Sequence, residues 1–203
     1  MPEKGRQVFR AVVIGVSTGG VRALQILLCG LPHDFPVPII VVTHITPESD
    51  NALAMLLDSQ CALRVKEADE HETALAGTAY LAPANYHLLI ERDATFSLSS
   101  DPPVMYARPS ADVLFESAAA AFGPGLIGVV LTGAGADGSR GLKKIKDRGG
   151  VAVVQDPADA DMKDMPMNAL KTTRADYTEP LTAIAGRLMK IVAGITTQDV
   201  AHA

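Results

Sequence analysis

The chain has 203 residues, 48% of them hydrophobic and 20% charged, which is typical of a globular protein with one sizeable core. Its net charge of -5 and its scarcity of aromatic residues (4%, no Trp) argue against nucleic-acid binding, which usually needs a basic surface or stacking rings. The polar first ten residues lack the apolar core of a signal peptide, and the longest apolar runs, AVVIGV and IIVV, are too short for membrane insertion.

Short apolar runs alternate with segments of helical spacing along the chain. The first part predicts a strand at 9–16, a helix at 21–30, a strand at 38–45, a helix at 50–60 and a strand at 62–68. Three short alternating runs within 77–99 predict antiparallel strands at one edge. The last part predicts a helix at 110–122 capped by Ser110, a strand at 126–132, a helix at 142–149, a strand at 151–155 and a helix at about 180–194.

This alternation predicts the α/β class: a doubly wound, mainly parallel sheet with helices on both faces and a small antiparallel edge addition. We assign residues 1–203 to a single domain with a core at about 8–195 and loose tails at 1–7 and 196–203. Cys29 and Cys61 lie in apolar, helix-like segments without metal-ligand spacing, so we expect two buried reduced thiols. Together with the N-terminal composition, this favours a cytoplasmic protein.

The turn after the first predicted strand, GVSTGG at 15–20, contains a candidate nucleophile. Gly15-x-Ser17-x-Gly19 matches the motif that exposes a serine hydroxyl on a sharp strand-to-helix turn. The N–H of Thr18 at the start of the helix would then contribute to an oxyanion hole. Ser17 as a plain helix cap, or the loop as a phosphate site, are the alternatives. The α/β-hydrolase fold is a poor match, because only one strand precedes Ser17 and no suitable late histidine follows.

A hydroxyl nucleophile needs a base and an orienting acid. Among the five histidines, His44 ends the buried strand IIVVTH, and functional groups gather at the carboxyl ends of parallel strands. Asp137 follows the strand at 126–132 and would therefore lie at the same edge, where it would hold the histidine tautomer. The plain alternatives are a histidine bonded at a strand end and an aspartate that caps the helix at 138–148.

The glycines around Asp137 permit another interpretation. Gly133-x-Gly135-x-x-Gly138 follows a strand, precedes a helix and has Asp156 about 20 residues later, as in dinucleotide-binding loops. Its late position in the chain and the negative charge of Asp137 beside a pyrophosphate count against a cofactor. A calcium site in DPADADMKD is also disfavoured, because the EF-hand spacing is absent.

Taken together, these stretches resemble the catalytic domain of the chemotaxis receptor methylesterases of the CheB type. The resemblance extends over about residues 10–193 and rests on GVSTGG, VTHI, GTAYLAPANYHL, RPSADVLFES, GVVLTGAGADGSRGL and VVQDPADADMKDMPMNAL. It implies that Ser17 is the nucleophile, His44 the base and Asp137 the orienting acid. The implied reaction hydrolyses glutamate γ-methyl esters on receptor helices and releases methanol. Related enzymes also deamidate receptor glutamines, and neither a metal nor an organic cofactor is implied.

The same resemblance places Gly135 beside Thr18 among the groups that bind the oxyanion or the substrate. Arg108 precedes the helix cap and would either line the substrate cleft or bind only a local carbonyl or carboxylate. The basic run RGLKKIKDR at 140–148 would be a solvated helix face or would attract acidic receptor helices. Full-length relatives carry an N-terminal phospho-receiver domain, for which this chain has no room. A regulatory receiver would therefore be a separate protein.

Three positions depart from the family pattern. Thr43 stands where glutamine is frequent, and Ala134 stands where methionine is typical. The stretch Met165-Pro166-Met167-Asn168 lacks the arginine of the family's Met-Pro-Arg. Two functions from other classes stay open beside the esterase: a non-catalytic receptor-binding relative, and a nucleotide-binding module that uses Gly133 to Gly138.

Overall fold

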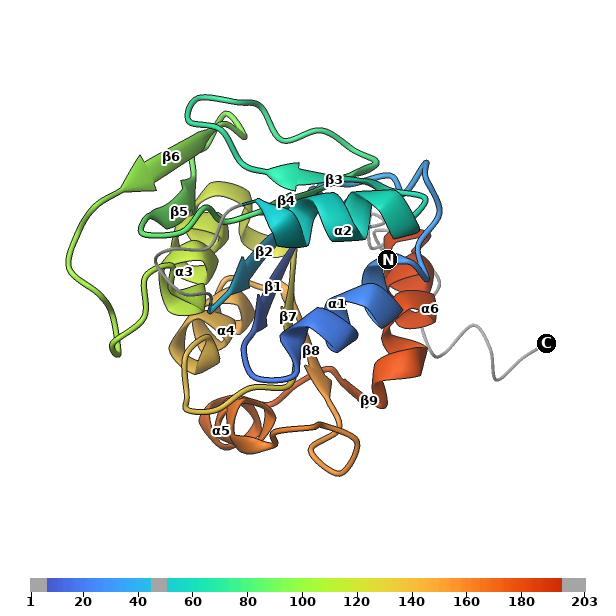
Figure 1. Cartoon of the computed structure of the whole chain (residues 1–203). Helices are drawn as coiled ribbons and strands as arrows, with labels where there is room; N and C mark the ends of the chain where they lie inside the picture. The colour runs from blue at the N-terminus through green and yellow to red at the C-terminus, as the bar shows by residue number, and fades with distance from the viewer. Residues whose placement is uncertain (1–6, 45–50, 195–203) are drawn as a thin grey trace, which may run out of the picture.

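The computed structural model describes residues 7–44 and 51–194, and its centre is a seven-stranded parallel sheet (Figure 1). The strand order is β3-β4-β2-β1-β7-β8-β9. These strands are β1 (Ala11–Val16), β2 (Ile39–Thr43), β3 (Arg64–Glu67), β4 (Thr78–Leu81), β7 (Leu126–Val130), β8 (Val151–Gln155) and β9 (Tyr177–Glu179). An antiparallel pair, β5 (His87–Ile90) and β6 (Phe96–Ser99), forms a second small sheet. The predicted fold class is confirmed.

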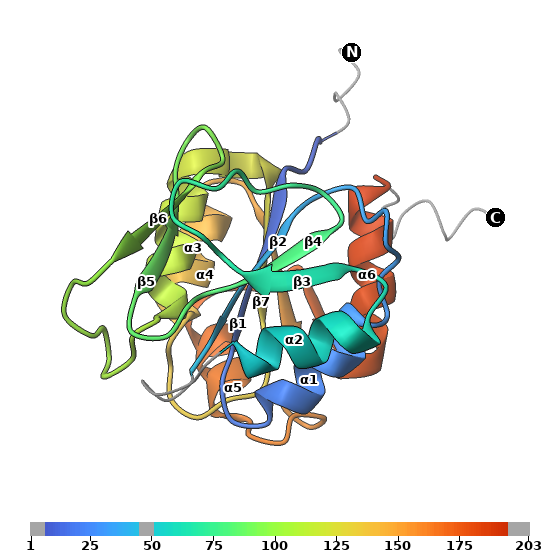
Figure 2. The same ribbon diagram turned by 45° about the horizontal axis from the view of Figure 1, so that its top comes forward.

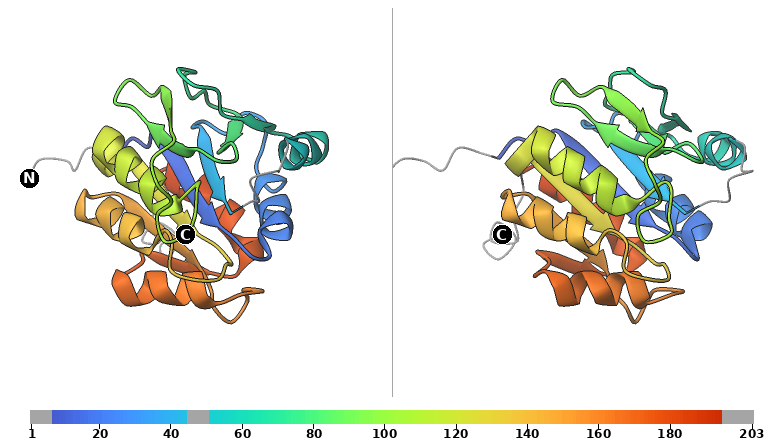
Figure 3. Two further views of the ribbon diagram at one scale, coloured as in Figure 1. Left: turned by 60° about the vertical axis from the view of Figure 1, so that its left-hand side comes forward. Right: turned by 90° about the vertical axis from the view of Figure 1, so that its left-hand side faces the viewer.

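Helices cover both faces of the large sheet (Figures 1 and 3). One layer consists of α1 (Gly20–Leu28), α2 (Ala52–Gln60) and α6 (Leu181–Val192). The other consists of α3 (Ala111–Phe122), α4 (Ser139–Asp147) and α5 (Asp164–Thr172), with a short 3-10 turn, η1 (Gly123–Gly125), after α3. No helix within the described ranges is long and apolar enough to cross a membrane.

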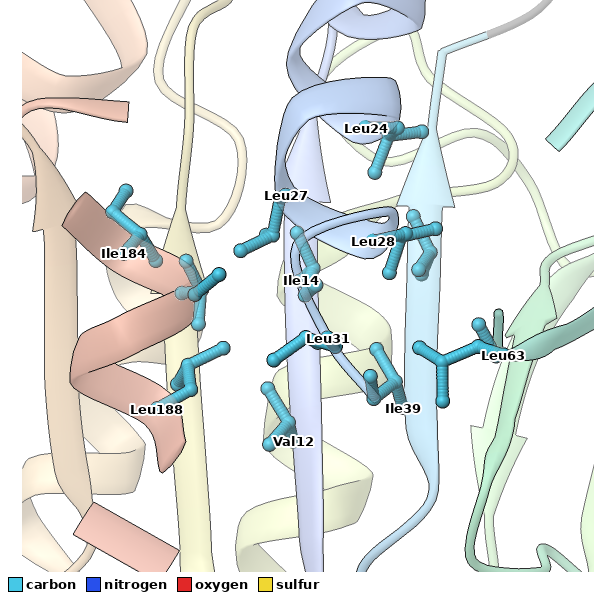
Figure 4. Packing of buried hydrophobic residues seen from close by; sticks show 14 of the residues in the cluster. Val12, Ile14, Leu24, Leu27, Leu28, Leu31, Ile39, Leu63, Ile184 and Leu188 are labelled. Carbon is cyan, nitrogen blue, oxygen red and sulfur yellow. The ribbon is translucent and has the colours of Figure 1, made fainter. Parts of the chain in front are cut away.

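Each helix layer forms because its apolar residues recur at helical spacing and meet a strand face. In α1, Leu24, Leu27 and Leu28 line one side of the helix and are completely buried. Figure 4 shows them on the side of α1 that faces β1 and β2, in the same buried cluster as Ile14 and Ile39. β1 and β2 are buried along their whole length, as expected for central strands covered on both faces.

One part of the predicted topology needs correction. Thr78–Leu81 was predicted as part of an antiparallel edge, but β4 runs parallel inside the large sheet, between β3 and β2. Among the strands of the described residues, β5 and β6 are the antiparallel pair, and they pair with each other at the side of α3 (Figure 3). The reason is that TAYL is buried at all four positions, which suits an internal parallel strand.

Three elements of the described residues were not predicted: η1, α5 and β9. α5 contains Pro166 in its first turn, where proline is tolerated, and β9 has three residues that are not fully buried. The predicted strand end at residue 45, the helix start at 50 and most of the two tails lie outside the described residues.

The two cysteines are joined, which contradicts the expectation of buried reduced thiols. Cys29 and Cys61 form a disulfide, and Cys29 is exposed. They are the C-cap residues of α1 and α2, which lie side by side, so the helix ends bring the two Cα atoms to 4.2 Å (Figure 2). Because disulfides persist mainly in oxidising compartments, this bridge does not support the cytoplasmic location, which stays a prediction.

The topology changes direction at β1. Chain segments before residue 82 build the sheet outward through β2, and segments after residue 126 build it outward through β7. In such sheets the connections leave in opposite directions at the switch point, so a crevice opens beyond the carboxyl ends of the strands. Ser17 follows β1, His44 follows β2, and Asp137 lies on the loop after β7.

Candidate active site

Ser17 lies on the tight turn between β1 and α1. Its N–H donates to the Thr132 carbonyl at 3.0 Å, and its carbonyl accepts from the Gly20 N–H at 2.7 Å, so the backbone of the turn is fixed on both sides. The N-cap of α1 is Gly19, with φ of 81°, and no side chain caps the helix. The interpretation of Ser17 as a helix cap is therefore wrong, and its hydroxyl points elsewhere.

The hydroxyl of Ser17 is hydrogen-bonded to His44. Ser17 Oγ lies 3.1 Å from His44 Nδ1, and His44 Nε2 lies 2.9 Å from Asp137 Oδ2. Because an ionised carboxylate can only accept, Nε2 carries the ring proton and Nδ1 presents a lone pair to the serine. The His44 N–H donates to the Val16 carbonyl at 3.3 Å, which holds the start of this side chain beside the end of β1.

Asp137 is the acceptor of five hydrogen bonds. Oδ1 accepts from the Ser110 hydroxyl (2.8 Å), the Asp112 N–H (3.0 Å) and the Gly138 N–H (3.0 Å). Oδ2 accepts from the Ala111 N–H (2.7 Å) and from His44. Burial by itself would raise the pKa of Asp137, but the bonds from His44, the two α3 amides and Ser110 hold it below its ordinary value. The carboxylate is therefore kept ionised beside the imidazole.

The capping role of Asp137 differs from the predicted one. It was expected to cap the helix at 138–148, yet α4 begins after Gly138 without a side-chain cap. Asp137 instead accepts from the first two amides of α3, which places a negative charge at that helix N-terminus. Ser110 occupies the predicted N-cap position of α3, but its hydroxyl donates to Asp137 rather than accepting from its own helix.

We predict that Ser110→Ala lowers the free energy of unfolding by about 1.5–3 kcal/mol at pH 7, the usual value of a hydrogen bond to a charged group. The pKa of Asp137 is lowered in the folded protein. The stability that the ionised Asp137 contributes is therefore fully present above the unfolded-state pKa of about 3.9, and it is lost as the pH falls from there through the folded-state pKa. The difference between wild type and variant should therefore shrink in acid. Urea unfolding at pH 7 and near pH 3 measures this, and an equal difference at both values would contradict it.

The glycine loop between β7 and α4 packs tightly against the serine turn. A Cβ at Gly133 would overlap Met165 Sδ and lie 2.8 Å from Ser17 Cβ, so only glycine fits there. Gly135 and Gly138 have φ of 90° and 86°, a region that favours glycine. Asn168 Nδ2 donates to the Gly135 carbonyl at 2.7 Å, which ties the loop to α5. Each glycine of the dinucleotide-like spacing thus has a conformational or packing reason.

A second buried carboxylate supports this region from behind. Asp112 is fully buried, accepts from the Gly141 N–H at 2.7 Å and pairs with Arg140 Nε at 3.0 Å. Burial raises the pKa of Asp112 despite these partners, and the charge of Asp137 adds to this. The pair joins the first turns of α3 and α4, between which Asp137 is held.

Two pockets share His44, and two of the residues predicted for the oxyanion and the substrate line the first of them, whereas Thr18 lines neither. Arg108 and Gly135 line a pocket of about 440 Å³, together with Asp137. Arg108 Nη1 donates to the carbonyls of Ser100 (2.8 Å) and Asp101 (3.1 Å), so its guanidinium also holds a local loop. Within the described part of the chain, the N–H groups of Thr18 and Gly135 donate no hydrogen bond.

Two of the three departures from the family pattern border these pockets. Thr43 is buried and lines the second pocket, of about 350 Å³, which contains Ser17. Ala134 lines the first pocket. Asn168 belongs to the stretch that lacks the family's arginine, and its side chain holds the glycine loop. Over the described ranges, no three His, Cys, Asp or Glu side chains are grouped as metal ligands.

Neighbouring carboxylates neutralise part of the positive charge of the basic run on α4. Arg140 pairs with Asp112, and two of the lysines pair with Asp147 and Asp176. Its attraction for acidic helices is reduced accordingly.

Sequence reasoning missed the supporting residues rather than the three central ones. The hydroxyl of Ser110, the Asp112–Arg140 pair and Asn168 all act on the site from other elements. Polar residues at the start of a helix were the signal for Ser110 and Asp112, but that signal equally describes an ordinary cap.

Comparison with known proteins gives one family. Residues 12–188 match the family model described as CheB methylesterase. A Leptospira interrogans protein, named provisionally as a protein-glutamate methylesterase/protein-glutamine glutaminase, is 48% identical over 183 residues, which cover 90% of this chain and 95% of the relative. The crystal structure of the Thermotoga maritima CheB methylesterase catalytic domain superposes with a TM-score of 0.87 at 36% identity, covering 91% of this chain and 99% of that one.

Other relatives are longer than this chain. A Geobacter metallireducens protein-glutamate methylesterase/protein-glutamine glutaminase is 40% identical over 185 residues, which are 52% of its length. The Myxococcus xanthus protein-glutamate methylesterase FrzG is 42% identical over 182 residues, which are 54% of its length. The similarity is therefore to one part of these proteins.

Proposed function

The chain belongs to the CheB methylesterase family, and on that basis we propose that it hydrolyses glutamate γ-methyl esters on chemotaxis receptor helices with Ser17, His44 and Asp137. Membership makes it a methylesterase, which is a carboxylic ester hydrolase acting in chemotaxis. The receptor substrate and the roles of the three residues are the proposed part. The continuous hydrogen-bonded chain from Ser17 Oγ to the Asp137 carboxylate is the observation that supports these roles most.

The first half of the proposed reaction forms an acyl-enzyme. Ser17 Oγ attacks the ester carbonyl while His44 Nδ1 removes its proton. The resulting imidazolium lies between the serine and the ionised carboxylate of Asp137, which stabilises the positive charge. His44 Nδ1 then gives the proton to the departing methoxide, and methanol leaves.

The second half repeats these roles with water. Water donates a proton to His44 Nδ1 and attacks the acyl carbonyl, and the Ser17 oxygen leaves with that proton. The product is a glutamate carboxylate, and the enzyme returns to its starting state. Either ring nitrogen of His44 can act as the base, provided that the nitrogen facing Ser17 is unprotonated at the start.

The negative oxygen of each tetrahedral intermediate needs donors. The N–H of Thr18 follows the nucleophile at the start of α1, where the helix dipole also favours a negative charge. The N–H of Gly135 is the second donor that we propose, from the loop held by Asn168. The absence of a hydrogen bond from either N–H within the described residues leaves both available to a ligand.

A direct test combines product release with labelling. The protein should release methanol from a methylated receptor fragment, and a fluorophosphonate should label Ser17 and stop the reaction. Mass spectrometry of the labelled peptide identifies the modified residue. Receptor binding without methanol release would favour a non-catalytic relative. Labelling at another serine with loss of activity would contradict the assignment of the nucleophile.

A second candidate activity is deamidation of receptor glutamines, because several relatives carry a glutaminase in their names. The same residues suffice, since the leaving group takes its proton from His44 and departs as ammonia instead of methanol. Ammonia release from an unmethylated receptor fragment tests it. A separate receiver protein stays our proposal for the regulatory partner.

A further inference from the structure

A tight turn beside the proposed catalytic residues carries two large apolar side chains. Val104 and Ala107 form an isolated antiparallel bridge, with backbone hydrogen bonds of 3.0 and 2.9 Å in the two directions. Met105 and Tyr106 are the two residues of the turn, which we call the Met105–Tyr106 tip. Tyr106 is fully exposed (103%) and Met105 is half exposed (53%). Both line the pocket that contains His44 and Asp137.

The backbone of this tip is unfavourable for its residues. Met105 has φ of 48° and Tyr106 has φ of 67°, so both lie in the left-handed region. Two-residue turns with both central φ values positive strongly prefer Asn-Gly, and neither methionine nor tyrosine relieves the steric cost as glycine does. Unfavourable backbone positions that persist in a protein cluster at functional sites. The presence of methionine and tyrosine in this turn is therefore not explained by the stability of the turn or by the solubility of the protein.

The base of the tip is held firmly. Arg108 donates to the carbonyls of Ser100 and Asp101, and His87 Nε2 lies 3.2 Å from the Pro102 carbonyl. His87 is buried, so this contact comes from the core of the small sheet. The tip is thus presented at a defined position on the pocket rim.

From these observations, and resting on the function proposed above, we propose that the Met105–Tyr106 tip packs against the receptor helix that carries the methyl ester. An α-helix is about 10–12 Å across with its side chains, so a helix whose ester reaches Ser17 must lie across the pocket rim. Methionine and tyrosine are enriched at the centres of protein interfaces. The exposed Val21 lines the second pocket, beside Ser17, and would extend the same contact surface.

This role concerns recognition of the helix and not the chemical step. The tip touches the parts of the receptor that surround the ester, so it should lower KM for a helical substrate. A small ester occupies only the space around Ser17 and gains nothing from the tip. The two substrates therefore separate docking from catalysis.

The test uses the double variant Met105→Asn, Tyr106→Gly, which gives the turn its preferred sequence and removes both side chains. We expect an unchanged or raised Tm, a fall of at least tenfold in kcat/KM for a methylated receptor fragment, mainly through KM, and hydrolysis of N-acetylglutamate γ-methyl ester within twofold of wild type. Tyr106→Phe should keep most of the receptor activity, because the ring stays. Met189→Gln, at an exposed apolar residue of α6, is the matched control and should change neither substrate.

The outcomes separate this proposal from the one on which it rests. Unchanged kcat/KM for the receptor fragment would overturn the docking role. An equal loss on both substrates would also overturn it, because the tip would then act on the catalytic residues. If the wild type hydrolyses the small ester and not the receptor fragment, the proposed receptor substrate is wrong, and the docking proposal fails with it.

Discussion

Replacing Ser17 with alanine should reduce the rate of methanol release at least about 10⁴-fold and leave the fold intact. In a well-studied serine hydrolase, removal of the nucleophile costs about 2 × 10⁶ in kcat, and the oxyanion hole and substrate binding alone retain about 10³–10⁴ over water. Alanine removes only Oγ, whose single hydrogen bond is to His44. The backbone bonds to Thr132 and Gly20 stay.

Methanol release from a methylated receptor fragment measures the effect, and circular dichroism with urea unfolding checks the fold. Ser139→Ala is a suitable control, because the buried Ser139 hydroxyl has no hydrogen-bond partner within the described residues. That variant should keep wild-type turnover. If Ser17→Ala retained turnover near the wild-type value, another nucleophile would have to be sought.

Replacing Asp137 with asparagine should lower turnover by up to about 10⁴-fold, the loss seen for the same change in a serine triad. Oδ1 accepts three hydrogen bonds and Oδ2 accepts two, so the new amide nitrogen should occupy the Oδ2 position, where fewer donors oppose it. It would then donate to His44 Nε2. The ring proton would move to Nδ1, which faces Ser17 and could no longer accept its proton.

Asp137→Asn should also lower the free energy of unfolding, whereas the same kind of change at an exposed aspartate should have little effect on it. The N–H groups at the start of α3 lose an ionised acceptor in a buried position. Because the pKa of Asp137 is lowered in the folded protein, this loss should be large at pH 7 and should shrink as the pH falls below the ordinary aspartate pKa of about 3.9. Asp147→Asn, which affects only an exposed pair with Lys143, is the matched control.

Turnover and urea unfolding across this pH range measure the two effects of Asp137→Asn. Wild-type turnover at full stability would remove Asp137 from the proposed mechanism. A changed nucleotide affinity with unaltered hydrolysis would instead favour the nucleotide-binding alternative for Gly133 to Gly138.

The sequence predicted the fold class and the neighbourhood of the three central residues, because both depend on local patterns. Buried strands of continuous apolar residues, separated by helical periodicity, require a parallel sheet covered on two faces. In such a sheet, residues that follow β1, β2 and β7 meet at one edge. The sequence by itself therefore places Ser17, His44 and Asp137 in one group.

The details that only the tertiary structure decided all depend on contacts between distant segments. The position of β4 between β3 and β2, the bridge between Cys29 and Cys61, and the capping of α3 by Asp137 join residues that no local pattern connects. The orientation of the His44 ring is of the same kind, because the carboxylate that fixes its tautomer is 93 residues away. Local propensity acts over one or two turns of chain, whereas hydrogen bonds to a buried carboxylate are set by how whole helices pack around it.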